Sequence, residues 1–214
     1  MTIKIESTFH LSNQSINLSK YDDLMMTSIY SSIGLDEYEN LSLEELDELD
    51  AKGEFPEPII IGRICAHRFD LSFHDEDLCI VADCVSSDLV YFASYFLLEE
   101  GNEFRSCNYL FYLNGVFIEP QYRGNNYGLH ALALFLQAFA WGETVGCHPV
   151  PIKDLKDKYP AHQGKRLMRN YWSKIGLERY SEKHNILWTP AWEMPDWLRT
   201  NLLEDYELKN NFNI

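Results

Sequence analysis

The sequence predicts an α/β fold, because segments with the periodicity of strands alternate along the chain with segments that have the periodicity of helices. The clearest example is the stretch from Asn108 to Trp141, where a run of aromatic and branched residues precedes a glycine-containing turn and a long apolar helix. The strand-like segment TVGCHPVPI follows this helix directly. A strand on each side of a helix predicts a right-handed βαβ unit here.

The residues before this unit predict three strands and three helices. Strands are expected at residues 3–11, 58–73 and 78–83, and helices at residues 20–34, 43–53 and 86–101. Gly34 would end the first of these helices. Ser42 and Glu45 would form a capping box at the start of the second. Residues 54–58 (EFPEP) are expected to be a linker.

The residues after the unit predict a helix, a hairpin and a terminal helix. A linker at residues 153–162 leads to a helix at about residues 163–175, one side of which carries Lys165, Arg166 and Arg169. A hairpin at residues 177–190 and a helix at residues 195–209 would follow. We expect one domain over residues 1–190 and a helical extension over residues 191–214.

The composition favours a globular protein of the cytoplasm. Hydrophobic residues make up 46% of the chain and aromatic residues 14%, which argues against disorder, and no apolar run reaches the length of a membrane span. The N-terminus lacks the charged and then apolar build of a signal peptide. Five irregularly spaced cysteines suggest reduced thiols. His67, His74, Cys79 and Cys84 lack the close CxxC pair of a structural zinc site, so no metal is expected.

The net charge of −15 bears on the partners of the protein. It argues against nucleic-acid binding, which depends on basic surface. A polyanionic ligand would have to be met by local positive charge, whereas the whole chain would attract a cationic reaction partner. An acidic surface that only maintains solubility is an equally good account of the charge.

The turn after Ile118 has the features of a phosphate site. Pro120 ends the strand, because proline has no backbone N–H to give to a sheet. The helix opens between Gly124 and Gly128, which gathers several free backbone N–H groups at its N-terminus. A P-loop is excluded because no Lys-Ser or Lys-Thr follows the turn, and the glycine spacing excludes the dinucleotide fingerprint GxGxxG.

This turn resembles the acyl-CoA loop of the GNAT superfamily of N-acetyltransferases. The matching positions, in order, are Ile118, Pro120, Tyr122, Arg123, Gly124, Asn126 and Gly128. Asn126 stands where the family usually has glycine, and asparagine is one of the few residues that tolerate a positive φ. Ile175, Gly176 and Leu177 resemble the end of the closing helix of the family. The resemblance covers about residues 109–188.

The resemblance implies a mixed, mostly antiparallel central sheet with helices on both faces and a splay between strands four and five. The helix at about residues 86–100 would be an addition to the minimal plan of the family. The two helices after strand one would form a wall of the acceptor site. In this chain that pair is strongly acidic, with Asp36, Glu37, Glu39, Glu44, Glu45, Asp47, Glu48 and Asp50. A mouth that attracts an amine and a simply solvated surface both fit this pattern.

The resemblance also implies that acetyl-CoA (coenzyme A) binds around the turn. Backbone N–H groups from Arg123 to Leu129 would hold the pyrophosphate, and the strand edge near Phe117 and Ile118 would pair with the pantetheine amides. Arg123, with Lys165 or Arg166, would offset the phosphate charge. The candidate cofactor-binding residues are Phe117, Ile118, Arg123, Gly124, Asn125, Asn126, Tyr127, Gly128, Leu129 and Lys165.

Four side chains are candidates for catalysis. His148 lies at a strand end beside the expected splay and has suitable chemistry near pH 7. Tyr171 is a candidate acid for the leaving thiolate, although the usual tyrosine of the family falls by counting on Trp172, and its usual asparagine on Lys165. Tyr112 holds the position of the glutamate base of the related histone acetyltransferases, but a phenol is a poor base at neutral pH. Glu119 lies close to the turn.

Two functions follow from the resemblance. The first is an N-acetyltransferase that transfers an acetyl group from acetyl-CoA directly to a primary amine in a ternary complex. The acceptor would be a small molecule, a polyamine or a protein amine, and the chain a monomer or homodimer. The second is a catalytically degenerate relative that acts as a binding or regulatory protein. Asn126, Trp172 and Lys165 favour the second reading.

Overall fold

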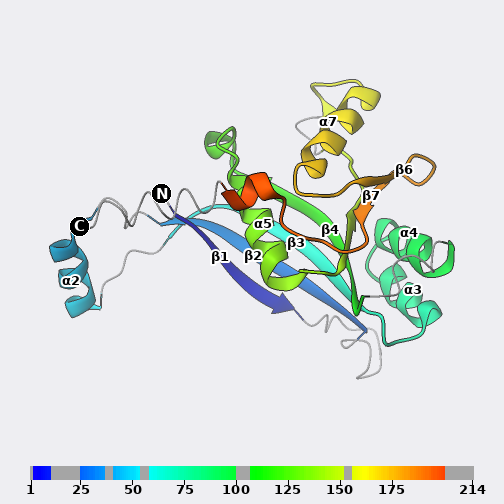
Figure 1. The fold of residues 1–214 in the computed structure, drawn as a ribbon, viewed down its shortest axis with the longest axis horizontal. Helices are drawn as coiled ribbons and strands as arrows, with labels where there is room; N and C mark the ends of the chain where they lie inside the picture. Colours follow the sequence, from blue (N-terminus) through cyan, green and yellow to red (C-terminus); the bar gives the residue numbers. More distant parts are fainter. Residues whose placement is uncertain are drawn as a thin grey trace.

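An open, mostly antiparallel sheet forms the frame of the molecule (Figure 1). The computed structural model describes residues 2–10, 25–36, 41–53, 58–99, 107–151 and 156–200. Within them, the strands are β1 (Thr2–His10), β2 (Met26–Asp36), β3 (Ile59–Asp70), β4 (Tyr109–Ile118), β5 (Thr144–Cys147), β6 (Arg179–Ser181) and β7 (Ile186–Thr189). They form one seven-stranded sheet in the order β1-β2-β3-β4-β5-β7-β6. Only β4 and β5 pair in parallel.

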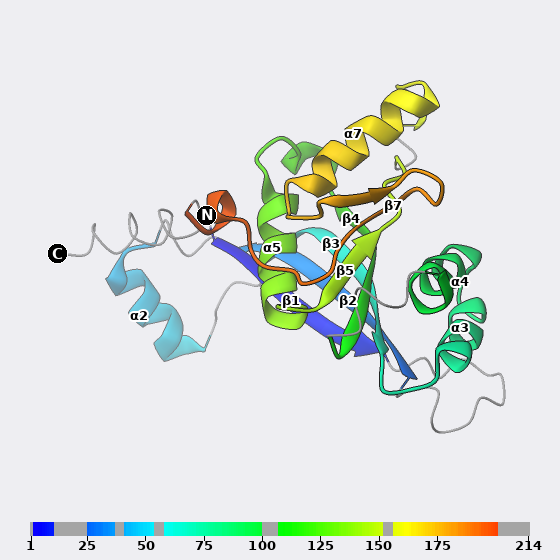
Figure 2. The ribbon, with the colours of Figure 1, turned by 45° about the vertical axis from the view of Figure 1, so that its right-hand side comes forward.

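The described helices are α2 (Leu43–Lys52), α3 (Asp75–Asp83), α4 (Ser87–Ser94) with the π-helical turn η2 (Tyr95–Glu99), the 3₁₀ turn η3 (Pro120–Tyr122), α5 (Tyr127–Phe139) and α7 (Ala161–Ser173). Residues 196–200 are also helical. Helices cover both sides of this sheet, with α5 and α7 on one side and α3 and α4 on the other, whereas α2 stands apart (Figure 2). The predicted α/β class with a mostly antiparallel sheet is confirmed.

Each face of the sheet has its own apolar core. Phe111 and Leu113 of β4 pack with α5 and α7, whereas Leu110 and Tyr112 pack with α3 and α4. This is the alternation expected of a strand buried on both faces. Helix α5 is buried along most of its length, as its nearly continuous apolar sequence predicts.

An irregularity in β4 changes which side chains face α5. Ala66 of β3 pairs with Leu113 and Cys65 pairs with Gly115, so Asn114 is an extra residue on β4. The parity of the strand changes at this bulge. Val116 and Ile118 therefore pack on the α5 side, in line with Phe111 and Leu113.

The helix predicted at residues 20–34 is wrong, because residues 26–36 form strand β2. Ile29 and Ile33, four residues apart, suit both a helix and one face of a strand. Pairing decides between them, since β2 is hydrogen-bonded along its length to β1 on one side and β3 on the other. Such long-range pairing overrides local spacing.

The strand predicted at residues 78–83 is also wrong, because these residues belong to helix α3. Leu78, Val81 and Ala82 are buried at the i, i+3, i+4 spacing of a helix. The first turn carries Asp75, Glu76 and Asp77, and negative charge is favourable at a helix N-terminus.

Several other predicted elements agree with the structure. Strand 109–118 has the expected limits, Ser86 caps α4, and α7 begins two residues before its predicted start. The Ser42–Glu45 capping box is present in α2, and Gly53 ends that helix with φ 66°. Residues 20–24, residues 54–57, the linker residues 153–155 and the terminal helix beyond residue 200 lie outside the described residues. None of the described helices is both long and apolar enough to span a membrane.

His67 supplies a stability prediction. It is buried on β3, its Nδ1 lies 3.0 Å from the Ser28 hydroxyl, and burial lowers its pKa to about 4. The unfolded chain takes up a proton near pH 6.5 that the folded chain takes up only near pH 4. The contribution of neutral His67 is therefore complete above pH 6.5 and is lost as the pH falls toward 4.

When the pH falls from 7 to 4.5, the unfolding free energy of the wild type should decrease by about 2–3 kcal/mol more than that of His67→Gln, because glutamine cannot titrate. Urea denaturation at the two pH values measures this difference. His162→Gln, an exposed change on α7, is the control and should behave as the wild type. Equal losses in the wild type and His67→Gln would contradict the prediction.

Candidate functional site

The sheet opens between β4 and β5. The two strands share the residue pairs Leu110–Thr144, Phe111–Val145 and Tyr112–Gly146, after which β5 ends at Cys147. Strand β4 continues to Ile118 while paired only with β3. The second half of β4 therefore has a free edge.

Val116 and Ile118 present their backbone groups to this free edge. The Glu119 N–H donates to the Ile61 carbonyl on β3 at 2.8 Å, so Glu119 faces β3 and its neighbour Ile118 faces away. By the same alternation Phe117 faces β3. The backbone groups of Phe117 therefore pair with β3, and those of Val116 face the free edge together with Ile118.

Arg123 forms a hydrogen bond with one of the backbone groups on this free edge. Its Nε donates to the Ile118 carbonyl at 2.7 Å, and its guanidinium carbon lies 5.5 Å from the centre of the Phe117 ring. Arg63 lies at the same distance from this ring. Arg123 thus braces the turn against the strand that precedes it.

A pocket of about 460 Å³ lies beside the free edge of β4. Its walls come from the end of β4, the turn, the N-terminus of α5, α7 and the residues just before α7. The lining residues are Val116, Ile118, Tyr122, Arg123, Gly124, Asn126, Tyr127, Gly128, Leu129, Tyr159, Leu167, Met168 and Tyr171. Of the ten predicted binding residues, Phe117, Asn125 and Lys165 do not line it.

The turn holds two residues with positive φ at the floor of this pocket. Gly124 has φ 96°, a region that favours glycine. Asn126 has φ 59° and is the N-cap residue of α5, so the expectation that asparagine sustains the turn is confirmed.

These conformations leave backbone donors unused at the N-terminus of α5. The N–H groups of Gly124, Asn125, Asn126 and Gly128 have no acceptor in the described part of the chain. The sequence predicted free N–H groups from Arg123 to Leu129, but the observed set is smaller. The Arg123 N–H donates to the Pro120 carbonyl, and the Leu129 N–H donates to the Asn126 carbonyl. Unused donors and the positive end of the helix dipole together suit an anion.

Tyr171 of α7 reaches this helix end. A Cβ added at Gly128 would lie 2.7 Å from the Tyr171 Oη and 3.4 Å from Ile118 Cγ1, so only glycine allows the phenol to approach. The hydroxyl has no hydrogen-bond partner among the described residues. Burial raises the pKa of Tyr171 to about 12, which keeps the phenol protonated as a donor at neutral pH.

The neighbouring Trp172 has a structural role. It is 3% exposed and belongs to the apolar core under α5 and α7. Counting from the helix end aligns Trp172 with the tyrosine of the resembled family, but of these two neighbours only Tyr171 lines the pocket.

The segment that includes the pocket residues Tyr159, Leu167 and Met168 is rich in positive charge. Residues 156–169 carry five cationic side chains, Lys156, Lys158, Lys165, Arg166 and Arg169, and one carboxylate, Asp157. Lys165 and Arg166 are exposed on α7. In a chain of net charge −15, this stretch gives an anionic ligand a favourable approach.

His148 and Tyr112 lie on the α4 side of the sheet, away from Tyr171. Their ring centres are 5.8 Å apart, and neither residue lines the pocket. Nδ1 of His148 lies 3.1 Å from the Asn185 carbonyl and Nε2 lies 3.3 Å from the Asp88 carbonyl. Both ring nitrogens of His148 thus face backbone carbonyls, and neither faces the pocket.

The two other acid–base candidates are no better placed. Burial raises the pKa of Tyr112, which strengthens the objection to it as a base. Glu119 is half-buried and is not among the pocket residues. Within the described residues, no carboxylate and no histidine lines the pocket.

Within the described residues, the two acidic helices expected as a wall are not found. Residues 26–36 are a strand, and α2, which carries Glu44, Glu45 and Glu48, stands apart from α5 and α7 in both Figures 1 and 2. Glu37 and Glu39 lie outside the described residues.

Five lining residues were absent from the sequence-based candidates, namely Val116, Tyr122, Tyr159, Leu167 and Met168. Two of them could have been predicted from the sequence. Tyr122 is one of the matching positions of the turn, and Met168 lies one helical turn before Tyr171, on the same side of the helix. Val116 depends on the bulge at Asn114, and Tyr159 on the path of the chain before α7, neither of which has a clear mark in the sequence.

Comparison with known proteins adds no identification. A scan against protein-family models, a search of curated proteins and a search of solved structures each find no match.

The contact between Gly128 and Tyr171 is testable by a double-mutant cycle. We expect Gly128→Ala to destabilise the wild type by about 1–3 kcal/mol, because the added methyl group overlaps the phenol oxygen. In a Tyr171→Phe background the cost should fall by at least about 1 kcal/mol. Urea unfolding of the four proteins measures the coupling.

Gly115→Ala is the matched control, because a Cβ at Gly115 meets nothing within 4 Å. It should show no coupling with Tyr171→Phe. An equal cost of Gly128→Ala in both backgrounds would show that the hydroxyl does not restrict this position.

Proposed function

We propose that this protein is an N-acetyltransferase of the GNAT type, which transfers an acetyl group from acetyl-CoA directly to a primary amine. The observation that carries the proposal is the set of unused N–H groups of Gly124, Asn126 and Gly128, three residues that line the pocket beside the free edge of β4. The matching residues of the turn support the same reading.

The pocket suits the separate chemical parts of an acyl-CoA. The N–H groups at the start of α5 suit a diphosphate, since their donors and the helix dipole act together. The free edge of β4 at Val116 suits the amides of an extended arm, which can bind as an added strand does. Arg123 leaves the Ile118 N–H available and covers the Ile118 carbonyl.

Tyr171 is the residue best suited to the leaving group. Transfer forms a bond from the amine nitrogen to the acetyl carbon and breaks the bond from that carbon to sulfur, so the sulfur needs a proton. The Tyr171 hydroxyl is protonated, has no partner in the described chain, and lies close to Ile118 and Val116, the β4 residues that the thioester arm would follow. Orientation of the two reactants supplies several kcal/mol of the remaining barrier.

A second candidate function is a binding or regulatory protein that retains the ligand and lacks the reaction. The absence of a carboxylate or histidine among the described pocket residues favours it, because no side chain there takes the proton from the ammonium. The engagement of both His148 ring nitrogens by backbone carbonyls points the same way.

Ligand binding is the first test. We expect acetyl-CoA at one hundred times its dissociation constant to stabilise the protein by about 2.7 kcal/mol, measured by thermal unfolding. Thioester turnover is then followed over a panel of primary amines that includes polyamines and peptides. If acetyl-CoA does not stabilise the protein, the proposal is contradicted. Stabilisation without turnover of any amine would favour the binding protein.

Tyr171→Phe tests the reaction itself. We expect kcat to fall at least about tenfold while the affinity for acetyl-CoA stays within about threefold, because the hydroxyl acts on the leaving sulfur. Tyr30→Phe, an exposed change on β2, is the control and should leave both quantities unchanged. An unchanged kcat in Tyr171→Phe would exclude the proton donor.

A further inference from the structure

The outer rim of the pocket has two large side chains that folding leaves exposed. Tyr159 is 40% exposed and Leu167 is 44% exposed, and both line the pocket. Single exposed apolar side chains are common on protein surfaces. Two that share one cavity, next to unused anion-binding groups, indicate contact with a ligand.

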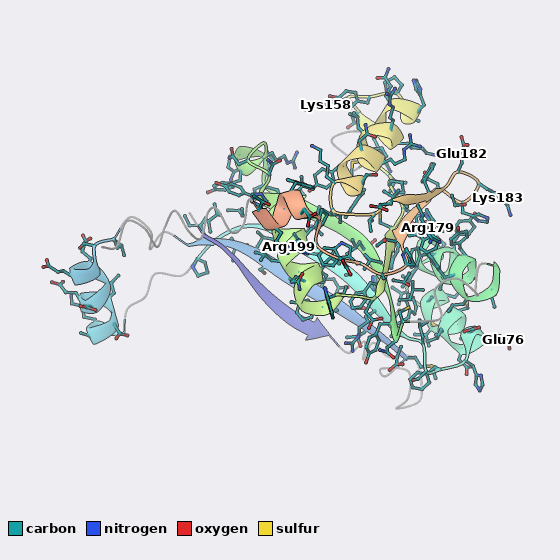
Figure 3. The ribbon with its side chains drawn as sticks, in the orientation of Figure 1. Glu76, Lys158, Arg179, Glu182, Lys183 and Arg199 are labelled. Carbon is teal, nitrogen blue, oxygen red and sulfur yellow. The ribbon has the colours of Figure 1, made fainter. Side chains whose placement is uncertain are left out.

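Tyr159 lies away from the anion-binding end of the cavity, and Leu167 lies between the two. Tyr171 contacts Gly128 at the start of α5, Leu167 is about one turn earlier on α7, and Tyr159 precedes the helix. With a rise of 1.5 Å per residue, the first residue of α7 lies about 15 Å along the axis from Tyr171. Lys158, the neighbour of Tyr159, appears at the outer end of α7 in Figure 3.

The arm of the ligand leaves the anion-binding end in another direction. It follows the free edge of β4 from Ile118 and Val116 toward the end of the β4–β5 ladder at Tyr112. In an acyl-CoA the diphosphate joins the arm to the nucleoside. If the arm follows β4, the nucleoside extends from the other end of the diphosphate, toward Tyr159 and Leu167. The surroundings of Tyr159 are cationic, with Lys156 and Lys158 on either side of Asp157.

We propose that Tyr159 and Leu167 form a nucleobase-binding rim, on which the purine ring of the donor nucleotide packs. The inference rests on the proposed function, and it adds that the protein selects acyl donors through their nucleoside. A phenol ring is suited to stacking on a base, and the aliphatic side chain of Leu167 provides further apolar contact.

The test compares acetyl-CoA with acetyl-phosphopantetheine, which has the same thioester arm and no nucleoside. Dissociation constants are measured by calorimetry for the wild type, Tyr159→Ala and Tyr159→Phe. We expect Tyr159→Ala to weaken acetyl-CoA binding about five- to thirtyfold and to leave acetyl-phosphopantetheine within about twofold. Tyr159→Phe keeps the ring and should bind both ligands as the wild type does.

Ile80→Ala is the matched control, because Ile80 is exposed on α3 and does not line the pocket. It should change neither constant. Equal weakening of both ligands by Tyr159→Ala, or no weakening of either, would overturn the rim while the proposed function stands. Binding of neither ligand by the wild type would overturn both.

Discussion

The early end of the β4–β5 ladder is the constraint on which the site depends. Three residue pairs hold the two strands together, and the chain of β5 then turns away at His148. The free half of β4 would be an unpaired edge in the middle of the sheet if nothing covered it. Helix α7 and the turn before α5 close around it and leave a pocket where β5 would otherwise continue.

The central unit was predictable because local and long-range preferences agree there. The aromatic and branched run of β4, Pro120 after its end, the turn residues Gly124 and Asn126 and the apolar α5 all favour the observed structure. The N-terminus of α5 could be named from sequence for the same reason. The acyl-CoA proposal rests on this agreement of pattern and geometry.

Other parts were not predictable, because they depend on contacts between distant residues. Strand β2 takes its conformation from pairing with β1 and β3, whereas its own spacing also suited a helix. The bulge at Asn114 turns Val116 toward the pocket, and a single extra residue in a ladder is visible only beside its partner. The resemblance implied that Arg123 offsets phosphate charge, whereas its contact with the Ile118 carbonyl had no signal in the sequence.

The contact between Arg123 and the Ile118 carbonyl has a consequence for the protein without its ligand. A bare strand edge is a template on which a second chain can add, and such pairing leads to aggregation. Helix α7 and the turn cover part of this edge, and Arg123 occupies one of its carbonyls with a cationic side chain, so fewer backbone groups remain for edge-to-edge association of two molecules. The side chain that shapes the turn thus also reduces the tendency of the open sheet to pair with a second copy of the chain.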